Sequence, residues 1–145
     1  MITKTVRSRA ARSVGYTVAA VVNTVLLFLV NVRPGWRSVP FLTEDTSRVL
    51  LLVNLSLMAG VVTNLTYVIH DAPRWKALGD LVANSLSLAV LIRVWAVFPF
   101  AFDAREWTLI TRTVLVIAMV GTSIAMVVQA VSATRAPHRS VSGHA

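Results

Sequence analysis

The run VLLLVNLSLMAGVVTNLTYVI (Val49–Ile69) contains no charged side chain and decides the fold of this chain. At about 1.5 Å per residue, a helix of this length measures about 30 Å, which matches the hydrocarbon thickness of a bilayer. Three more apolar runs flank it, at Val14–Val32, Leu81–Phe102 and Thr113–Val131, and Arg93 is the only charged residue in the four runs. A soluble domain of 145 residues has too small an interior to bury four such helices, so the runs predict transmembrane helices.

The predicted fold class is therefore all-α: a polytopic membrane protein with a four-transmembrane-helix bundle. We place the spans at about 14–32, 49–69, 78–98 and 108–131. They form one transmembrane domain over residues 14–131. Residues 1–13 are expected to be a basic cytoplasmic N-terminal segment, and residues 132–145 a disordered cytoplasmic tail.

The composition also indicates a membrane protein. The chain is 56% hydrophobic and 14% charged, with a mean hydropathy of +0.71. It has no cysteine, which excludes disulfides, thiol redox chemistry and thiolate metal sites. The net charge of +8 comes from short segments beside the apolar runs, where anionic lipid headgroups explain it better than nucleic acid does. The expected partners are membrane lipids, a second copy of the chain or a larger membrane complex, and not nucleic acid.

The distribution of Lys and Arg predicts the orientation in the membrane. If the N-terminus is cytoplasmic, eight basic residues lie inside: Lys4, Arg7, Arg9, Arg12, Arg74, Lys76, Arg135 and Arg139. Five then lie outside: Arg33, Arg37, Arg48, Arg105 and Arg112. The positive-inside rule therefore places both termini in the cytoplasm. No small-residue cleavage site follows the first run, so it is expected to be a retained helix and not a signal peptide.

The connecting segments contain residues that begin and end helices. Pro73 suits the first turn of the third helix, and Pro99 is expected to end that helix. Asp103 with Glu106 three residues later predicts a capping box at the start of the fourth helix. These residues predict short connections and no soluble domain between the spans.

An internal repeat relates the two halves of the chain. At offsets of 59 to 61 residues, Asn23, Arg33, Trp36, Pro40-Phe41 and Glu44 recur as Asn84, Arg93, Trp95, Pro99-Phe100 and Asp103. Such a repeat predicts two tandem helical hairpins related by an axis along the membrane normal, with Arg33 and Arg93 at similar depth near the outer leaflet. Short apolar segments also match by chance, so the alternative is a bundle without a repeat.

Three segments are distinctive: RPGWRSVPFLTEDTSR (Arg33–Arg48), WKALGDLV (Trp75–Val82) and RVWAVFPF (Arg93–Phe100). They resemble a group of uncharacterised small four-span integral membrane proteins of high-GC Gram-positive bacteria. The resemblance covers nearly the whole of residues 14–131. That group has no assigned activity, so the resemblance implies a bacterial inner (plasma) membrane location and no functional residues.

Polar residues within the spans are the candidates for an intramembrane site. Arg93 lies about 7 Å of helix from the outer end of its span, so it either snorkels to the headgroups or lines a buried site. The uncharged candidates are Asn23, Asn54, Asn64 and Asn84. They either hydrogen-bond neighbouring helices or line a polar cavity together with Arg93.

Arginine and tryptophan near the predicted outer side are candidates for contacts with lipid headgroups. These candidates are Arg33, Arg93, Trp36 and Trp95. Anchoring at the membrane interface is the simpler interpretation of the aromatic residues. Toward the opposite side, Asp80 follows Lys76 by one helical turn and is expected either to pair with it or to face headgroup water.

The sequence contains no catalytic constellation. His70 is the only histidine near a span, which excludes bis-histidine haem ligation within one chain, and there is no paired-carboxylate, phosphate-loop or nucleophile motif. We therefore expect no enzyme, cofactor or metal site. Three function classes remain. The protein is a structural or accessory helix bundle, a minimal transporter or channel that uses an Asn-lined seam, or a lipid-headgroup-binding protein. Packing is the first expectation, because Asn and Ser within spans most often join helices.

Overall fold

Residues 8–135 of the chain are described in the computed structural model. They form four long helices, α1 (Arg9–Asn31), α2 (Ser47–Ile69), α3 (Pro73–Val97) and α4 (Arg105–Thr134). Two short 3-10 turns, η1 (Trp36–Ser38) and η2 (Glu44–Thr46), lie between α1 and α2. All four long helices have the length and apolar composition needed to cross a membrane. The predicted all-α, four-helix transmembrane bundle is confirmed.

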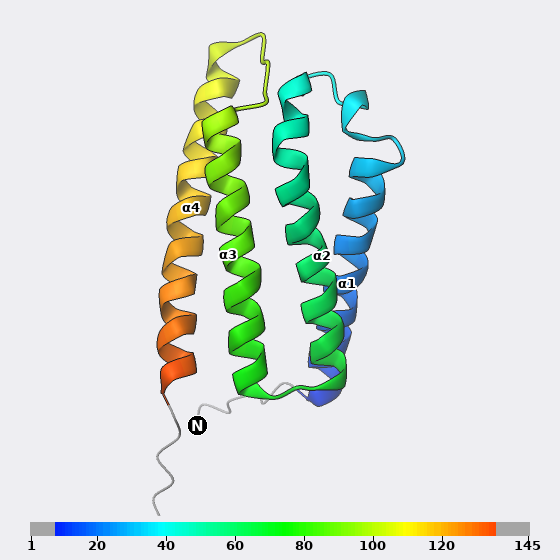
Figure 1. Ribbon diagram of the computed structural model, residues 1–145, viewed down its shortest axis with the longest axis vertical. Helices are drawn as coiled ribbons and strands as arrows, with labels where there is room; N and C mark the ends of the chain where they lie inside the picture. Colours follow the sequence, from blue (N-terminus) through cyan, green and yellow to red (C-terminus); the bar gives the residue numbers. More distant parts are fainter. Residues whose placement is uncertain (1–7, 136–145) are drawn as a thin grey trace, which may run out of the picture.

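The helices run up and down in sequence order. Each packs mainly against its neighbours along the chain, α1 against α2, α2 against α3 and α3 against α4 (Figure 1). The start of α1 and the end of α4 lie at one end of the bundle, which we call the terminal end (Figure 1). The connections at residues 32–46 and 98–104 lie at the opposite end, which we call the loop end.

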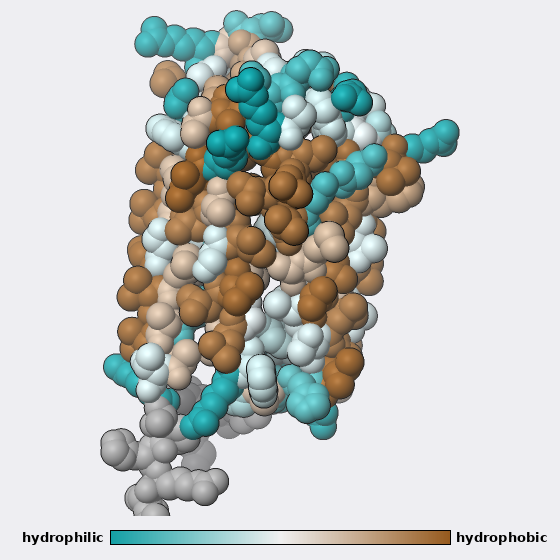
Figure 2. Space-filling model, in the orientation of Figure 1, coloured by the Kyte–Doolittle hydropathy of each residue, from teal (hydrophilic) through white to brown (hydrophobic). Residues whose placement is uncertain are grey.

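On the face that Figure 2 shows, apolar side chains cover most of the middle of the bundle, and hydrophilic side chains gather toward its two ends. Leu51, Ile117 and Val127 point outward and are 64–69% exposed. Few side chains are buried in the described part of the chain; the apolar ones are Ala20, Val49, Tyr67, Pro99 and Leu115. This pattern suits a bilayer, in which lipid tails solvate apolar side chains and polar contacts and close packing join the helices.

The helices extend beyond the predicted spans. α1 begins at Arg9 and not at 14, α3 at Pro73 and not at 78, and α4 at Arg105 and not at 108. α4 also continues to Thr134, three residues into the segment expected to be a disordered tail. Hydropathy locates only the apolar part of a helix, whereas backbone hydrogen bonding continues into the headgroup region. The described residues exclude 1–7 and 136–145, and with them most of the predicted tail.

The prolines bound α3 as predicted. Pro73 occupies the first turn, and Pro99 follows the helix directly after its C-cap residue, Phe98. Phe98 has a left-handed backbone conformation (φ 44°, ψ 68°), which turns the chain out of the helix. The capping box predicted at Asp103 is wrong, because the N-cap of α4 is Ala104 and no side chain caps it. The helix begins one residue too late for Asp103 to occupy the capping position.

The two connections at the loop end pair with each other through an antiparallel β-bridge. The backbone N–H of Thr43 donates to the Pro99 carbonyl (3.0 Å), and that of Ala101 donates to the Phe41 carbonyl (2.9 Å). These bonds satisfy backbone N–H and C=O groups that lie outside the helices. Near the hydrocarbon region, such groups must find a partner within the protein. They also join the α1–α2 hairpin to the α3–α4 hairpin.

The bridge joins two segments that the sequence repeat aligns, but its hydrogen bonds do not follow the repeat. The bridge pairs Leu42 with Phe100, and the adjoining bond joins Ala101 to Phe41. The 59-residue offset moves Phe41 onto Phe100 and Leu42 onto Ala101, so a symmetric bridge would have the Leu42 N–H donate to the Phe100 carbonyl. It donates to the Val39 carbonyl instead (3.2 Å). The helices do not keep the relation, since α4 makes no extensive contact with α1 within residues 8–135.

Arg33 and Arg93, which the repeat aligns, lie in different elements. Arg33 follows the end of α1, whereas Arg93 lies inside α3. When the two halves of the chain are aligned by the repeat, α3 extends several residues further than α1 before its connection begins. The repeat therefore describes the loop segments better than the helices that carry them.

Candidate functional site

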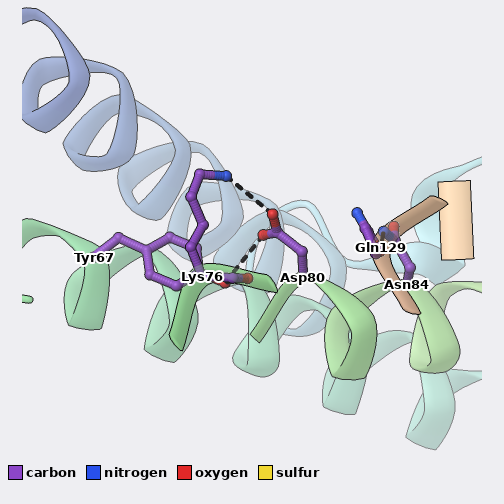
Figure 3. Close-up of polar contacts among 5 residues, drawn as sticks. All are labelled: Tyr67, Lys76, Asp80, Asn84 and Gln129. Atoms are coloured by element: carbon purple, nitrogen blue, oxygen red, sulfur yellow. Dashed lines mark hydrogen bonds and ion pairs between the residues drawn. The ribbon is translucent and has the colours of Figure 1, made fainter. Parts of the chain in front are cut away.

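Amide side chains join two of the three pairs of neighbouring helices. Between α1 and α2, Asn31 and Asn54 exchange two hydrogen bonds, each Nδ2 donating to the other residue's Oδ1 (2.8 and 2.9 Å). Between α3 and α4, Asn84 Nδ2 donates to Gln129 Oε1 (2.8 Å; Figure 3). Asn54 and Asn84 are predicted site residues, and the structure pairs each with an amide on the adjacent helix.

A pair of hydroxyl groups lies between α2 and α3. The Ser56 and Ser87 hydroxyl oxygens are 3.3 Å apart, at the long end of hydrogen-bond distances. Each contact between neighbouring helices therefore includes a polar side-chain pair. Such pairs stabilise association in membranes and fix which faces meet.

The remaining two asparagines bond to their own helices. Asn23 Nδ2 donates to the Ala19 carbonyl (2.9 Å), and Asn64 Nδ2 donates to the Gly60 carbonyl (2.7 Å). Asn23 also lies against Gly60 of α2, where a Cβ atom would come within 2.7 Å of the Asn23 Nδ2. Here the asparagine fills the space that a glycine leaves, and α1 and α2 approach closely.

Arg93 is exposed on the surface of α3. It lies nine residues after Asn84, about 13 Å along the helix. Asn84 is occupied by Gln129 of α4, so the structure does not bring Arg93 and Asn84 together in one polar site. The predicted grouping of the asparagines with Arg93 is not observed within residues 8–135.

The tryptophans at the loop end contact arginines other than those predicted. The Arg37 guanidinium lies 4.9 Å from the Trp36 ring centroid. The Arg112 guanidinium lies 4.8 Å from the Trp95 ring and 4.3 Å from the Phe98 ring. Both contacts are within cation–π range. Arg33, a predicted headgroup contact, is exposed in the connection after α1.

A cluster at the terminal end links α2 to α3. Lys76 Nζ lies 2.9 Å from Asp80 Oδ2, which confirms the predicted ion pair (Figure 3). Tyr67 of α2 reaches the same carboxylate, with its hydroxyl 3.0 Å from Asp80 Oδ1. The hydroxyl also lies 2.9 Å from the Lys76 carbonyl, so its single proton is shared between two acceptors.

Aromatic packing and a glycine hold Tyr67 in this position. Tyr67 is 4% exposed, and its ring meets that of Tyr16 edge-on, with centroids 5.3 Å apart. Lys76 Nζ lies 5.7 Å and 5.3 Å from the Tyr16 and Tyr67 rings. A Cβ atom at Gly79 would overlap the Tyr67 hydroxyl, so only glycine leaves room for it.

A second ion pair ties α1 to the α2–α3 connection. Arg12 Nη2 and Nε each lie 2.8 Å from Asp71 Oδ2. Together with the Tyr67–Lys76–Asp80 cluster, it joins three helices at the terminal end. The two carboxylates each face a cation, so both ion pairs are balanced in charge.

Sequence reasoning did not find Asn31 or Tyr67 as polar contacts. Asn31 ends its apolar run and has the pattern of a boundary residue. Tyr67 has the pattern of an interfacial aromatic anchor. The available signal was Gly79, a glycine in the second turn of a helix, since a helical glycine often marks a close approach.

Within residues 8–135, no group of three or more His, Cys, Asp or Glu side chains has an arrangement that could hold a metal ion. No protein family, curated protein or solved structure matches this chain. The fold and the contacts define its class as a four-helix membrane protein whose intramembrane polar side chains join its own helices.

Proposed function

We propose that the protein is a small structural or accessory component of a membrane, which packs against itself or against a larger membrane complex. One observation carries this proposal. The predicted polar residues Asn23, Asn54, Asn64 and Asn84 all bond to a neighbouring helix or to their own backbone. A transport seam needs polar groups that remain available to a solute, and one amide N–H of each of these asparagines is already engaged within the bundle.

The arrangement of the helices supports association with a second protein. α1 and α4 each pack mainly against one neighbour, whereas α2 and α3 each have two. The outward face of α4 carries large apolar side chains such as Ile117 and Val127. A partner helix of similar composition suits this face, because van der Waals packing between spans is a main source of association in lipid.

We place the protein in a bacterial plasma membrane with both termini in the cytoplasm. The excess of Lys and Arg in the sequence segments before α1, between α2 and α3 and after α4 supports this orientation. Arg9 and Arg74 are exposed at that end, where anionic lipid headgroups attract basic residues. The resemblance to four-span proteins of high-GC Gram-positive bacteria supports the choice of membrane.

Cross-linking in native membranes and flux assays in proteoliposomes test the proposal together. We expect cross-linking to capture the wild-type protein as an oligomer or with another membrane protein, and liposomes containing it to show no added ion or solute flux. Asn84→Leu should lower the captured fraction, because it breaks the contact to Gln129.

Ser85→Leu is the matched control, since Ser85 is exposed on the same turn and bonds only its own helix through the Leu81 carbonyl. The proposal fails if cross-linking finds only monomer. It also fails if the liposomes conduct and Asn84→Leu abolishes conduction while leaving the captured fraction unchanged.

A further inference from the structure

A cavity of about 1010 Å³ lies at the terminal end, between the start of α3 and the end of α4. The ion pairs and the Tyr67 contact at this end join α1, α2 and α3, and α4 takes no part in them. Most of the cavity wall is apolar, and its largest apolar side chain is Trp75. Arg74 and Arg135 are the charged residues on the described part of the wall. The cavity therefore combines an apolar wall with positive charge.

The charges of Arg74 and Arg135 are not balanced within residues 8–135. Both carboxylates at the terminal end, Asp71 and Asp80, are paired with other cations. Neither of the two arginines forms a side-chain hydrogen bond, an ion pair or a ring contact with another described residue. Two unpaired cations on one wall attract negative charge, so the complementary ligand is an anion.

The depth of the cavity in the membrane identifies the kind of anion. α3 has 25 residues and α4 has 30, so they measure about 38 and 45 Å, longer than the hydrocarbon layer of about 30 Å. Arg74 in the first turn of α3 and Arg135 at the end of α4 therefore lie at the level of the headgroups. Trp75, which is 64% exposed, is a residue type enriched at this boundary. Phospholipids present phosphate groups at this level, joined to an apolar portion that suits the apolar wall.

We propose that this cavity binds one phospholipid with an anionic headgroup. The guanidinium groups of Arg74 and Arg135 donate to the phosphate oxygens, whose geometry matches the guanidinium fork. The glycerol and the first carbons of the acyl chains lie against Trp75 and Ala77. The arginines are the donors, because the hydroxyl of Ser132 on the same wall already donates to a carbonyl of its own helix.

Basic pockets between transmembrane helices recognise lipid headgroups in this way. This site differs from the predicted headgroup contacts, which lie toward the loop end. It goes beyond the proposed accessory function and does not depend on it, since lipid binding is measured on the isolated protein and association is measured in native membranes.

The test is native mass spectrometry of the full chain in detergent micelles, with phosphatidylglycerol and phosphatidylcholine added in equal amounts. We expect one phosphatidylglycerol molecule to be retained, with a preference over phosphatidylcholine of at least about fivefold, as for one charge near a membrane surface. Excess glycerol 3-phosphate, which has the phosphate without the acyl chains, should not displace it.

Arg74→Gln and Arg135→Gln should each lower the affinity for phosphatidylglycerol about tenfold, as expected for one lost hydrogen bond to a charged group. Arg9→Gln is the matched control, because Arg9 is also exposed at the terminal end but does not line the cavity. It should leave the affinity unchanged. Without lipid, the melting temperatures of all three variants should equal that of the wild type, so a lost lipid reports binding and not unfolding.

Three results would overturn the proposal. An equal loss of affinity in all three variants would mean that the total charge of the terminal end attracts the lipid without a site. Equal retention of the two lipids would show that the headgroup charge is not recognised. Displacement by glycerol 3-phosphate would assign the cavity to a soluble phosphate compound instead of a lipid.

Discussion

The terminal end and the loop end of the bundle are held together by different forces. At the terminal end, the Arg12–Asp71 and Lys76–Asp80 ion pairs and the Tyr67 hydroxyl join three helices. At the loop end, backbone hydrogen bonds join the two connections. Stacked aromatic rings accompany them, with the Phe102 ring centroid 5.6 Å from those of both Phe41 and Phe100.

The two ends also differ in how closely their side chains must pack. Charged hydrogen bonds need short distances, so the terminal end requires a glycine where Tyr67 meets α3. Apolar contacts are not directional, so the loop end keeps its connections paired while leaving a cavity of about 530 Å³ beneath them. Substitutions at the terminal end should therefore have larger effects on stability than substitutions at the loop end.

The largest effect is expected for Gly79→Ala at the terminal end. The added methyl group overlaps the Tyr67 hydroxyl and forces α2 and α3 apart, at a cost of about 1–3 kcal/mol. Unfolding in mixed micelles, followed by circular dichroism, measures this cost. Gly121→Ala is the control, since within residues 8–135 no atom other than the adjoining backbone of α4 lies within 4 Å of the new Cβ atom. Equal stability of the two variants would show that α2 and α3 do not meet at Gly79.

Tyr67→Phe should lower the free energy of unfolding by somewhat less, about 1–2 kcal/mol. It removes one hydrogen bond to a charged group and keeps the aromatic ring. A double-mutant cycle with Asp80→Asn isolates the contribution of this contact. We expect the two substitutions to be non-additive. Additive losses would mean that the Tyr67 hydroxyl stabilises the bundle through the Lys76 carbonyl alone.

In the middle of the bundle, Asn84→Leu should lower the free energy of unfolding by about 0.6 kcal/mol and by no more than about 1.7 kcal/mol, the average and the maximum found for side-chain hydrogen bonds between transmembrane helices. Gln129→Leu should cost a similar amount, and the double variant little more than either. The same unfolding measurement applies. A double variant that loses the sum of the two single losses would rule out a direct contact between α3 and α4 at this point.

The smallest loss is expected at the loop end for Arg112→Gln, about 0.5–1 kcal/mol, from the contacts with Trp95 and Phe98. Tryptophan fluorescence in detergent should shift as the guanidinium leaves the Trp95 ring. If this variant proved less stable than Tyr67→Phe, the proposed difference between the two ends would be reversed.

Features that depend on neighbouring residues in the chain were predictable. Lys76 and Asp80 lie one helical turn apart on the same helix, and the prolines that bound α3 restrict the backbone at and next to their own positions. The capping box at Asp103 shows the limit of this reasoning, because it depends on where α4 starts to within one residue. The asparagines were correctly found as the polar residues of the spans, but the partners of Asn54 and Asn84 were not.

By itself, the sequence determined that four helices cross a membrane and approximately where each lies, because the free energy of transfer into lipid is a sum over consecutive residues. Only the tertiary structure decided that Asn31 meets Asn54, that Tyr67 reaches Asp80, and that an apolar cavity lies at the loop end. Each of these depends on how one helix is rotated and placed against the next. That placement comes from the fit of whole surfaces, which no local pattern of residues contains.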